Sequence, residues 1–194
     1  MSRRVLVLDG HPRAESFAGA LASRYAQAVS ARGAEVRLRK LSSMRFDPDL
    51  ALGHRGHQDW EPDLEAFWAD LTWAEHLVLV HPLWWGGAPA KLKGLFDRVL
   101  LPGLAFRYRK GNPLPEKLLK GRTARVILTS DTPDWYFRFG YGSAYRRQVT
   151  GQILELCGIA PVRFTHVGPI RNMKPDIADR FVTGMDGLAL RDAA

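Results

Sequence analysis

The stretch that decides the fold is residues 76–101, HLVLVHPLWWGGAPAKLKGLFDRVLL. Its first six residues, 76–81, enclose a continuous run of Val and Leu, which is typical of a strand buried on both faces. A turn with two adjacent glycines follows. An amphipathic helix is then expected over residues 88–101, with Pro89 in its first turn. A buried strand, a short loop and such a helix make one β-α unit of a parallel sheet.

The same alternation recurs on both sides of this stretch. Further strands are expected at residues 3–9, 34–41, 123–130 and 162–167, and further helices at residues 16–33, 62–73, 145–156 and 176–188. Residues 34–41 alternate apolar and charged side chains, as an edge strand does, whereas residues 76–81 belong at the centre of the sheet. The pattern predicts an α/β fold with a doubly wound, five-stranded parallel sheet and helices on both faces.

Length and composition limit the class of protein. The chain has 194 residues, of which 46% are hydrophobic and 25% charged. This balance supports one packed domain, residues 1–194, and excludes disordered and collagen-like chains. A single cysteine excludes a disulfide scaffold, and no apolar run approaches the ~20 residues that span a bilayer. A cytoplasmic protein without an integral membrane segment is therefore expected.

The formal net charge of +8 is compatible with several kinds of anionic partner. The basic residues are scattered, however, and no run reaches five like charges. A solvated basic surface is therefore favoured over nucleic-acid binding. A non-catalytic RNA- or DNA-binding domain remains the alternative that the charge leaves open.

In an open parallel sheet, ligands bind beyond the carboxyl ends of the strands. The loop after the first strand, residues 10–16, leads into a helix N-terminus, where free N–H groups favour phosphate. His11, Arg13 and the Ser16 hydroxyl add donors. The loop lacks the glycine pattern of dinucleotide-binding and P-loop proteins, and an ordinary capped helix is the other interpretation.

The loop after the third strand places Trp84 and Trp85 directly before Gly86 and Gly87. Flat indoles beside exposed backbone N–H groups suit a planar heteroaromatic ligand. The alternative is that the tryptophans pack into the core or an oligomer interface. Because neighbouring residues seldom face the same way, one of the two is expected in the core.

The loop after the fourth strand, Thr129, Ser130, Asp131 and Thr132, offers hydroxyl and turn N–H groups to the edge of a heterocycle. Five aromatic residues follow within residues 135–141. They predict an exposed apolar patch, either an aromatic-lined cavity or a dimer surface. Arginines interleaved with aromatic residues also permit stacking on single-stranded nucleic acid, as a weaker hypothesis.

Other reactive residues give little signal. His54, His57 and Asp59 have a common spacing, and no metal site is expected. Cys157 is expected as an inert core thiol. His166 ends a strand and fits a cap or a core position. We find no convincing hydrolase triad and no strand–turn–helix Gly-x-Ser-x-Gly.

Residues 81–106 closely resemble the NAD(P)H:quinone oxidoreductase family, which comprises the DT-diaphorase and bacterial modulator-of-drug-activity proteins. The shared features are a Pro-Leu-x-Trp run, a small-residue turn to proline, the helix segment Leu-Lys-x-x-Phe-Asp-Arg-Val of residues 92–99, and Gly-x-Ala-Phe of residues 103–106. The early His11, Ser16 and Phe17 resemble the family's phosphate loop. The resemblance covers residues 3–170 and implies a flavodoxin-like fold with strand order 2-1-3-4-5.

The resemblance also implies a tightly bound flavin, FAD or FMN. Its phosphates would be held by His11, Ser16, Phe17 and Ala18; its ring would be lined by Pro82, Leu83, Trp84, Trp85 and Gly86; and its pyrimidine edge would face Thr129, Ser130, Asp131 and Thr132. The family often has Thr-Thr-Gly-Gly at this last place, so Asp131 is a departure that would add negative charge near the flavin edge if it points inward. The relay histidine of the eukaryotic members is also missing, which leaves Tyr136, Tyr141 or water to move the proton.

As an activity, the resemblance implies two-electron, ping-pong reduction of quinones or similar acceptors by NADH or NADPH. It further implies a homodimer in which the aromatic segment completes the partner's pocket. An azo-compound, nitro-compound or free-flavin reductase is the nearest alternative. A flavodoxin-like regulatory subunit of a potassium-efflux transporter is an alternative of another class.

Overall fold

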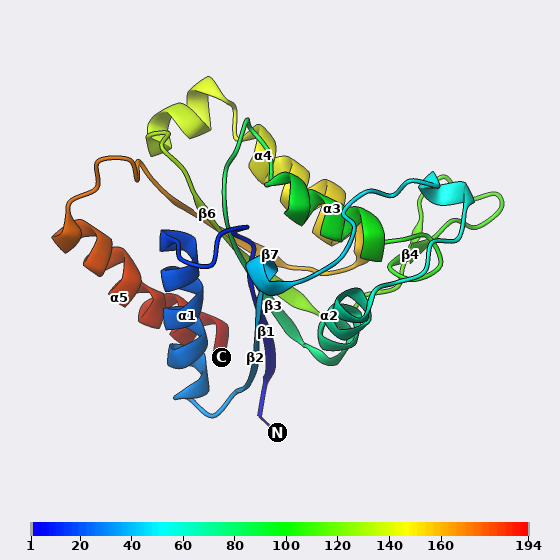
Figure 1. Cartoon of the computed structure of the whole chain (residues 1–194), viewed down its shortest axis with the longest axis horizontal. Coiled ribbons are helices and arrows are strands. Elements are labelled where there is room, and N and C mark those ends of the chain that lie inside the picture. The colour runs from blue at the N-terminus through cyan, green and yellow to red at the C-terminus, as the bar shows by residue number, and fades with distance from the viewer. Residues whose placement is uncertain (1, 194) are drawn as a thin grey trace.

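Five parallel strands form the central sheet of the structure, a computed structural model that describes residues 2–193. They are β1 (Arg4–Asp9), β2 (Glu35–Lys40), β3 (His76–Pro82), β6 (Thr123–Thr129) and β7 (Val162–Val167). Their order is β2-β1-β3-β6-β7, which confirms the expected order of the five main strands (Figure 1). Every residue of β3 is buried, and β2 lies at an edge with most of its residues exposed. The continuous and the alternating patterns are therefore both explained by place in the sheet.

Helices cover both faces of the sheet (Figure 1). One face carries α1 (Phe17–Ser30) and α5 (Pro175–Ala193). The other carries α2 (Pro62–Trp73), α3 (Ala90–Val99) and α4 (Ala144–Arg147), which continues as a π-helical segment over Gln148–Glu155.

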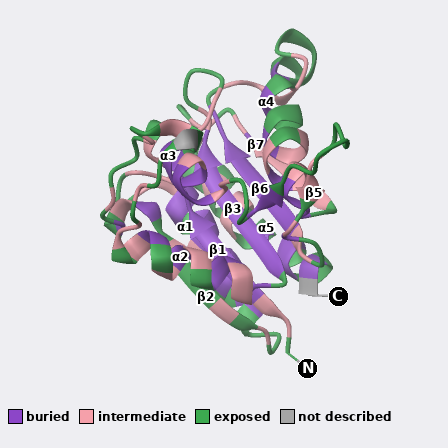
Figure 2. Cartoon of the chain, turned by 90° about the vertical axis from the view of Figure 1, so that its right-hand side faces the viewer, coloured by how far each residue is buried: buried purple, intermediate pink, exposed green. Residues whose placement is uncertain are grey.

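The sheet separates two hydrophobic cores (Figure 2). Successive side chains of a strand point to opposite faces, so the valines and leucines of β1 and β3 are divided between the two sides. Val5 and Val78 face α1 and α5, whereas Leu6 and Leu79 face α2 and α3. This division holds both helical layers on one rigid sheet.

The expected start of α1 is confirmed in detail. Ser16 has extended backbone angles, and its Oγ accepts a hydrogen bond of 3.0 Å from the N–H of Gly19. This is the geometry of an N-cap, which satisfies one of the helix's unbonded donors. The loop after β1 is thereby joined rigidly to the helix that follows it.

The structure contains short elements that the sequence did not predict, and its last helix is longer than expected. The region after α3 contains a short antiparallel ribbon, β4 (Phe106–Arg107) with β5 (Glu116–Lys117), which is too short to leave a periodic signal. The last helix extends from Pro175 to Ala193 and is longer than residues 176–188. The long loop between β2 and α2 includes 3₁₀ turns at Leu41–Ser43 and Gly53–Arg55.

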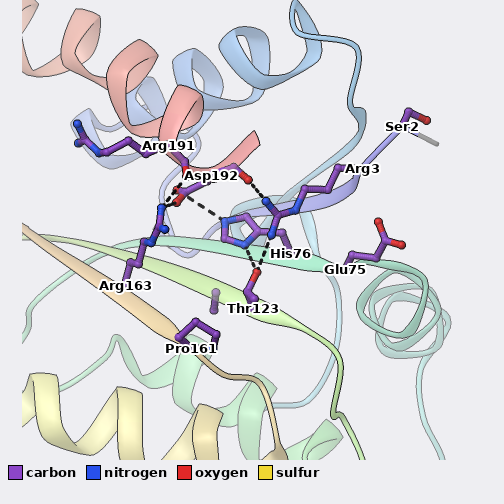
Figure 3. Close-up of a pocket in the computed structure, with 10 residues that line it drawn as sticks. Ser2, Arg3, Glu75, His76, Thr123, Pro161, Arg163, Arg191 and Asp192 are labelled. Carbon is purple, nitrogen blue, oxygen red and sulfur yellow. Dashed lines mark hydrogen bonds and ion pairs between the residues drawn. The ribbon is translucent and has the colours of Figure 1, made fainter. Parts of the chain in front are cut away.

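The amino ends of the strands meet at a buried ionic cluster around Asp192 of α5 (Figure 3). Its carboxylate accepts hydrogen bonds from Arg125 of β6, from Arg163 of β7 at 2.7 Å, and from the Tyr25 hydroxyl of α1 at 2.8 Å. His76 Nε2 of β3 lies 3.7 Å from the same carboxylate. One side chain thus ties α5 to α1 and to three strands.

The substitution Asp192→Asn should destabilise the fold by about 3 kcal/mol, because it leaves the buried guanidinium of Arg125 without a counter-charge. Urea unfolding followed by circular dichroism measures the loss. The matched control is Asp179→Asn on the same helix, where the carboxylate is exposed and little change is expected. Equal effects of the two substitutions would contradict a structural role for the cluster.

The same cluster predicts how stability depends on pH. Burial alone would raise the pKa of Asp192, but the nearby His76, the hydrogen bonds from Arg125 and Tyr25 and the charge of Arg125 outweigh it and hold that pKa well below its usual range. The stabilisation is therefore complete above the unfolded pKa of about 3.9 and is lost progressively as the pH falls below it. Unfolding free energy should fall more steeply in acid for the wild type than for Asp192→Asn.

Candidate functional site

Three loops are fixed side by side at the carboxyl edge of the sheet. Just after β1, β3 and β6, one backbone N–H donates to a carbonyl near the end of the neighbouring strand: Gly10 to Val80 at 2.7 Å, Leu83 to Thr129 at 2.8 Å, and Ser130 to Val167 at 3.0 Å. The ladder therefore continues one residue beyond each strand. The three loops in which the sequence predicted ligand binding begin in register with one another.

The loop after β1 presents a set of hydrogen-bond donors. Asp9 Oδ1 accepts from the N–H of His11, and His11 Nδ1 in turn accepts from the N–H of Arg13 at 3.0 Å. Burial lowers the pKa of His11, although the Arg13 bond and the charge of Asp9 oppose that effect. With Nδ1 accepting, the neutral imidazole carries its proton on Nε2, where it is free to donate.

The start of α1 adds further donors to those of His11. In the first turn, Gly19 N is taken by the Ser16 cap and Ala20 N by the Ser16 carbonyl. The N–H groups of Phe17 and Ala18 have no acceptor within the helix. The first turn contains no acidic residue. This end of a 14-residue helix is therefore suited to an anion such as phosphate.

The loop after β3 is a tight turn closed by two hydrogen bonds of 2.9 Å between the backbones of Trp84 and Gly87. Trp85 and Gly86 form its tip with positive φ angles of 50° and 74°. The turn lifts both indoles off the sheet, and Trp84 and Trp85 are 45% and 106% exposed. The expectation that one of them belongs to the core is therefore wrong.

The turn is also connected to the donor loop. The ring of Trp84 packs edge-on against His11, with 5.7 Å between ring centroids and 83° between their planes. The N–H groups of Trp85 and Gly86 make no hydrogen bond within the turn. The loops after β1 and β3 therefore form one continuous surface of donors and indole.

A cavity of about 600 Å³ opens between the loops after β3 and β6 and the segment that precedes α4. Seven residues expected at the site line it: Leu83, Trp85, Gly86, Ser130, Asp131, Thr132 and Tyr141. Phe137, Ala144 and Tyr145 complete the wall. Residues separated by up to 62 positions in the chain thus meet in one aromatic cavity.

The remaining expected residues lie around the cavity. Pro82 and Thr129 are the final, buried residues of β3 and β6, and they position the loops without lining the space. Trp84 covers His11 instead. Tyr136 contacts Tyr141, with 5.0 Å between the rings, but is not part of the cavity wall.

Asp131, the departure from the family pattern, lines the cavity and is half exposed. Its Oδ2 lies 3.3 Å from Arg171 Nε. The guanidinium partly offsets the negative charge that Asp131 brings to this edge, because the two opposite charges are in contact.

Two histidines that the sequence did not assign to the site lie behind its wall. His166 Nε2 is 2.8 Å from Ser130 Oγ, and His166 Nδ1 is 3.1 Å from Asp134 Oδ1. His81 is fully buried, bonded through Nδ1 to the Pro82 carbonyl and through Nε2 to the Tyr145 hydroxyl at 3.3 Å. Burial lowers the pKa of His81 to about 4, so it is neutral near pH 7. Both histidines occur at the carboxyl ends of strands, which is the one signal that could have indicated them.

Two further features of the described residues, 2–193, bear on the class of protein. None of the helices in this range has an apolar stretch long enough to cross a membrane. Cys157 is a free, buried thiol whose pKa burial raises to about 11, as expected for an inert core residue.

The sheet order and the ligand cavity at its carboxyl edge define a flavodoxin-like α/β protein. A family model described as the flavodoxin-like fold matches residues 3–183. The chain therefore belongs to this flavodoxin-like family, Flavodoxin_2, whose members include NAD(P)H quinone oxidoreductases.

Named relatives are similar over most of the chain. A Haemophilus influenzae protein named an uncharacterized NAD(P)H oxidoreductase is 32% identical over 170 residues, covering 85% of this chain and 83% of that protein. NAD(P)H dehydrogenase (quinone) 1 of Rattus norvegicus is 29% identical over 209 residues, covering 94% and 74%. The crystal structure of Smu.1420 from Streptococcus mutans has a TM-score of 0.82 at 28% identity, covering 96% and 98%. The homologues of this chain are thus NAD(P)H dehydrogenase (quinone) enzymes.

The left-handed backbone of Trp85 allows a test of whether its indole stabilises the fold. Trp85 holds a left-handed conformation that costs a non-glycine residue about 1 kcal/mol, and its exposed indole has little burial to lose. Trp85→Gly should therefore raise the free energy of unfolding by about 0.5–1 kcal/mol in urea titrations. The control is Trp135→Gly, where the backbone is right-handed and glycine should destabilise. A loss of stability in Trp85→Gly would show that the indole makes contacts that hold the fold.

Proposed function

We propose that this chain is a flavin-dependent NAD(P)H oxidoreductase that reduces quinones or similar acceptors by two electrons in a ping-pong cycle. The observation that carries the proposal is that a group of hydrogen-bond donors and an aromatic cavity adjoin each other. His11 and the free N–H groups of Phe17 and Ala18 at the start of α1 adjoin, through the Trp84–His11 contact, the turn whose tip lines the 600 Å³ aromatic cavity. A ligand with a phosphate group at one end and a flat heteroaromatic ring at the other matches both parts.

The residues present fit a flavin. The phosphate would be held by His11, by the Ser16 hydroxyl and by the backbone N–H groups of Phe17 and Ala18. No residue of the first turn is acidic, and burial raises the pKa of the Asp9 carboxyl, which lies beside Gly19. The side chain of Ser16 caps the helix through its oxygen, so its hydroxyl proton is still available to donate.

The aromatic part of the ligand would bind along the turn after β3. Trp85 offers its indole face, and the free N–H groups of Trp85 and Gly86 offer donors. Leu83 and Gly86 line the cavity, while Pro82 and Trp84 fix the position of the turn. In the loop Thr129–Thr132, the N–H groups of Ser130 and Thr132 are already bonded within the protein. The Asp131 N–H and the Thr132 hydroxyl would therefore meet the polar edge of the ring, where fixed donors favour negative charge.

When bound, the flavin supplies the redox chemistry, since it accepts a hydride from the nicotinamide and passes two electrons to the acceptor. The chain's own task is to position both substrates in turn and to supply a proton. Tyr141 reaches the cavity, and Tyr136 contacts Tyr141. The Tyr141 phenol would bind the acceptor, and Tyr141, Tyr136 or water would deliver a proton to its oxygen.

The relatives support the class of reaction. The proteins similar over most of this chain are named NAD(P)H oxidoreductase and NAD(P)H dehydrogenase (quinone). Absorption spectra test it directly: the purified protein, incubated with FAD or FMN, should show a flavin spectrum that NADH or NADPH bleaches without oxygen and benzoquinone restores. A protein that stays colourless would overturn the proposal. A flavin spectrum that neither nicotinamide bleaches would also overturn it, and would favour the regulatory-subunit alternative.

The phosphate end of the site gives a quantitative prediction. Ser16→Ala should weaken flavin binding by about tenfold or more, since it removes a hydrogen bond to a charged group. Stability should also fall by about 1 kcal/mol through loss of the cap. Fluorescence titration with FMN and with FAD measures the affinity. Ser30→Ala, in the exposed last position of the same helix, should change neither quantity.

We further propose that two copies of the chain associate through the aromatic segment before α4. Trp135, Phe139 and Tyr141 are 64%, 84% and 50% exposed, beside the fully exposed Trp85. Clustered exposed aromatic residues of this kind are typical of interfaces. The surface adjoins the cavity, so a partner there would complete the acceptor site.

Phe139→Asp should therefore convert a dimer into a monomer, because it buries a charge at the centre of the proposed interface. Light scattering coupled to size-exclusion chromatography gives the mass. Leu114→Asp changes another exposed apolar residue, 72% exposed, outside the aromatic segment, and should leave the dimer intact. A monomeric wild type, or a dimer unaffected by Phe139→Asp, would refute this interface.

A further inference from the structure

The hydrogen-bonded group Ser130, His166 and Asp134 is not used by the function proposed above. It joins the carboxyl ends of β6 and β7 to the segment that carries the cavity's aromatic residues. His166 is held on its flat side by Phe137, whose ring stacks on the imidazole at 4.5 Å. The side chain of His166 is only 3% exposed, so its ring has one orientation and two fixed partners.

The donors and acceptors of this group can be assigned. An ionised Asp134 can only accept, so His166 Nδ1 donates to it. In the neutral imidazole, Nε2 then accepts, and the Ser130 hydroxyl donates to Nε2. Ser130 Oγ also accepts from the backbone N–H of Thr132 at 3.1 Å. Every group is satisfied with His166 neutral.

The same atoms satisfy a second arrangement. The carbonyl of Thr132 lies 3.3 Å from Ser130 Oγ. If His166 gains a proton, Nε2 becomes a donor, and Ser130 Oγ accepts from it while its own hydroxyl proton turns to the Thr132 carbonyl. The exchange needs no movement of a heavy atom. The charge behind the cavity wall therefore changes by one unit at His166, while the heavy atoms of the wall keep their positions.

We propose that His166 is a positioning residue that takes up a solvent proton when the ligand of the cavity is reduced, and that Ser130 transmits this charge to the cavity wall. The inference rests on the flavin site proposed above. His166 forms and breaks no bond to the ligand, and the electrons come from the nicotinamide. Its proton offsets the negative charge that two electrons bring to the ring.

The connection to the cavity is direct. Ser130, whose hydrogen bond to His166 reverses, and Thr132, whose carbonyl then accepts from Ser130, both line the cavity, and His166 contacts Ser130 from behind. A reduced ligand that raises the pKa of His166 must, by reciprocity, bind more tightly when His166 is protonated. If the pKa is about 1 higher, the difference in affinity is about tenfold.

The surroundings of His166 hold its pKa below the usual value for histidine. Burial lowers the pKa of His166, the hydrogen bond and charge of Asp134 raise it, and Arg138 lowers it. Arg138 is itself paired with Asp134 at 2.7 Å. Beyond these, Arg146 lies over Phe164 next to the Phe137 stack, and Asp131 and Arg171 form their own pair.

Nuclear magnetic resonance of the histidine nitrogens tests the proposal in three samples: the flavin-free protein, the protein with bound FMN or FAD, and the latter after reduction with dithionite. His166→Gln assigns the signals. In the flavin-free protein, neutral His166 should carry its proton on Nδ1. The pKa of His166 should then be about 1 or more higher in the reduced sample than in the oxidised one.

Two variants with opposite effects serve as matched controls. Asp134→Asn should lower the pKa of His166, because it removes a negative charge, and Arg138→Gln should raise it, because it removes a positive charge. A redox titration across pH gives a second readout. Between the two pKa values of His166, the wild type should take up one more proton per two electrons than His166→Gln does.

The outcomes separate the two proposals. If flavin binds and is reduced, but the pKa of His166 is the same in both states, the inference is overturned and the proposed function stands. A neutral tautomer with the proton on Nε2 overturns the hydrogen-bond assignment without any flavin. If the protein binds no flavin, the proposed function and the inference fall together.

Discussion

The site depends on one repeated backbone interaction. After each of the strands β1, β3 and β6, the N–H of a loop residue donates to a carbonyl near the end of the adjacent strand. These bonds are made in a fully buried part of the sheet, where an unpaired group would be costly. Each bond fixes the first residue of one of these loops against the end of the neighbouring strand. The donors at α1, the Trp85 turn and the cavity wall are placed by this register.

That register also explains why the site has two unlike halves. The loop after β1, residues 10–16, ends at the Ser16 cap, which leaves the N–H groups of Phe17 and Ala18 free at the start of α1. The loop after β3 first makes a closed turn and only then enters α3. The turn holds Trp85 away from the sheet, and the aromatic segment after β6 faces it across the cavity. The same parallel strands thus carry a loop with hydrogen-bond donors after β1 and an aromatic loop after β3.

Sequence patterns were sufficient for the parts of the fold that repeat. The order of the strands was implied by the family resemblance. The unbroken apolar run of β3, the alternation of β2 and the Ser16 cap each follow from local rules, and a parallel sheet follows from the alternation of strands with helices. The pairing of β4 with β5 did not, since two-residue strands have no period. Nor could the indoles be placed, because a turn with positive φ at Trp85 is set by hydrogen bonds between Trp84 and Gly87 and not by residue preference.

The candidate site was predictable to the same degree. The loops were found because their position after parallel strands is a rule of the architecture, and seven of the residues expected there line the cavity. The side chains behind the wall were missed. Ser130 and His166 are 36 residues apart, and their contact depends on how β6 and β7 align, which no short-range pattern encodes.

The ionic cluster around Asp192 lies at the amino ends of the strands (Figure 3), at the opposite edge of the sheet from the loops after β1, β3 and β6. Interactions far apart in a structure contribute nearly independently to stability. Residues in the loops at the carboxyl edge can therefore be replaced while the anchorage of the last helix stays unchanged. Because the two edges are far apart, substitutions at one edge leave the interactions at the other edge intact.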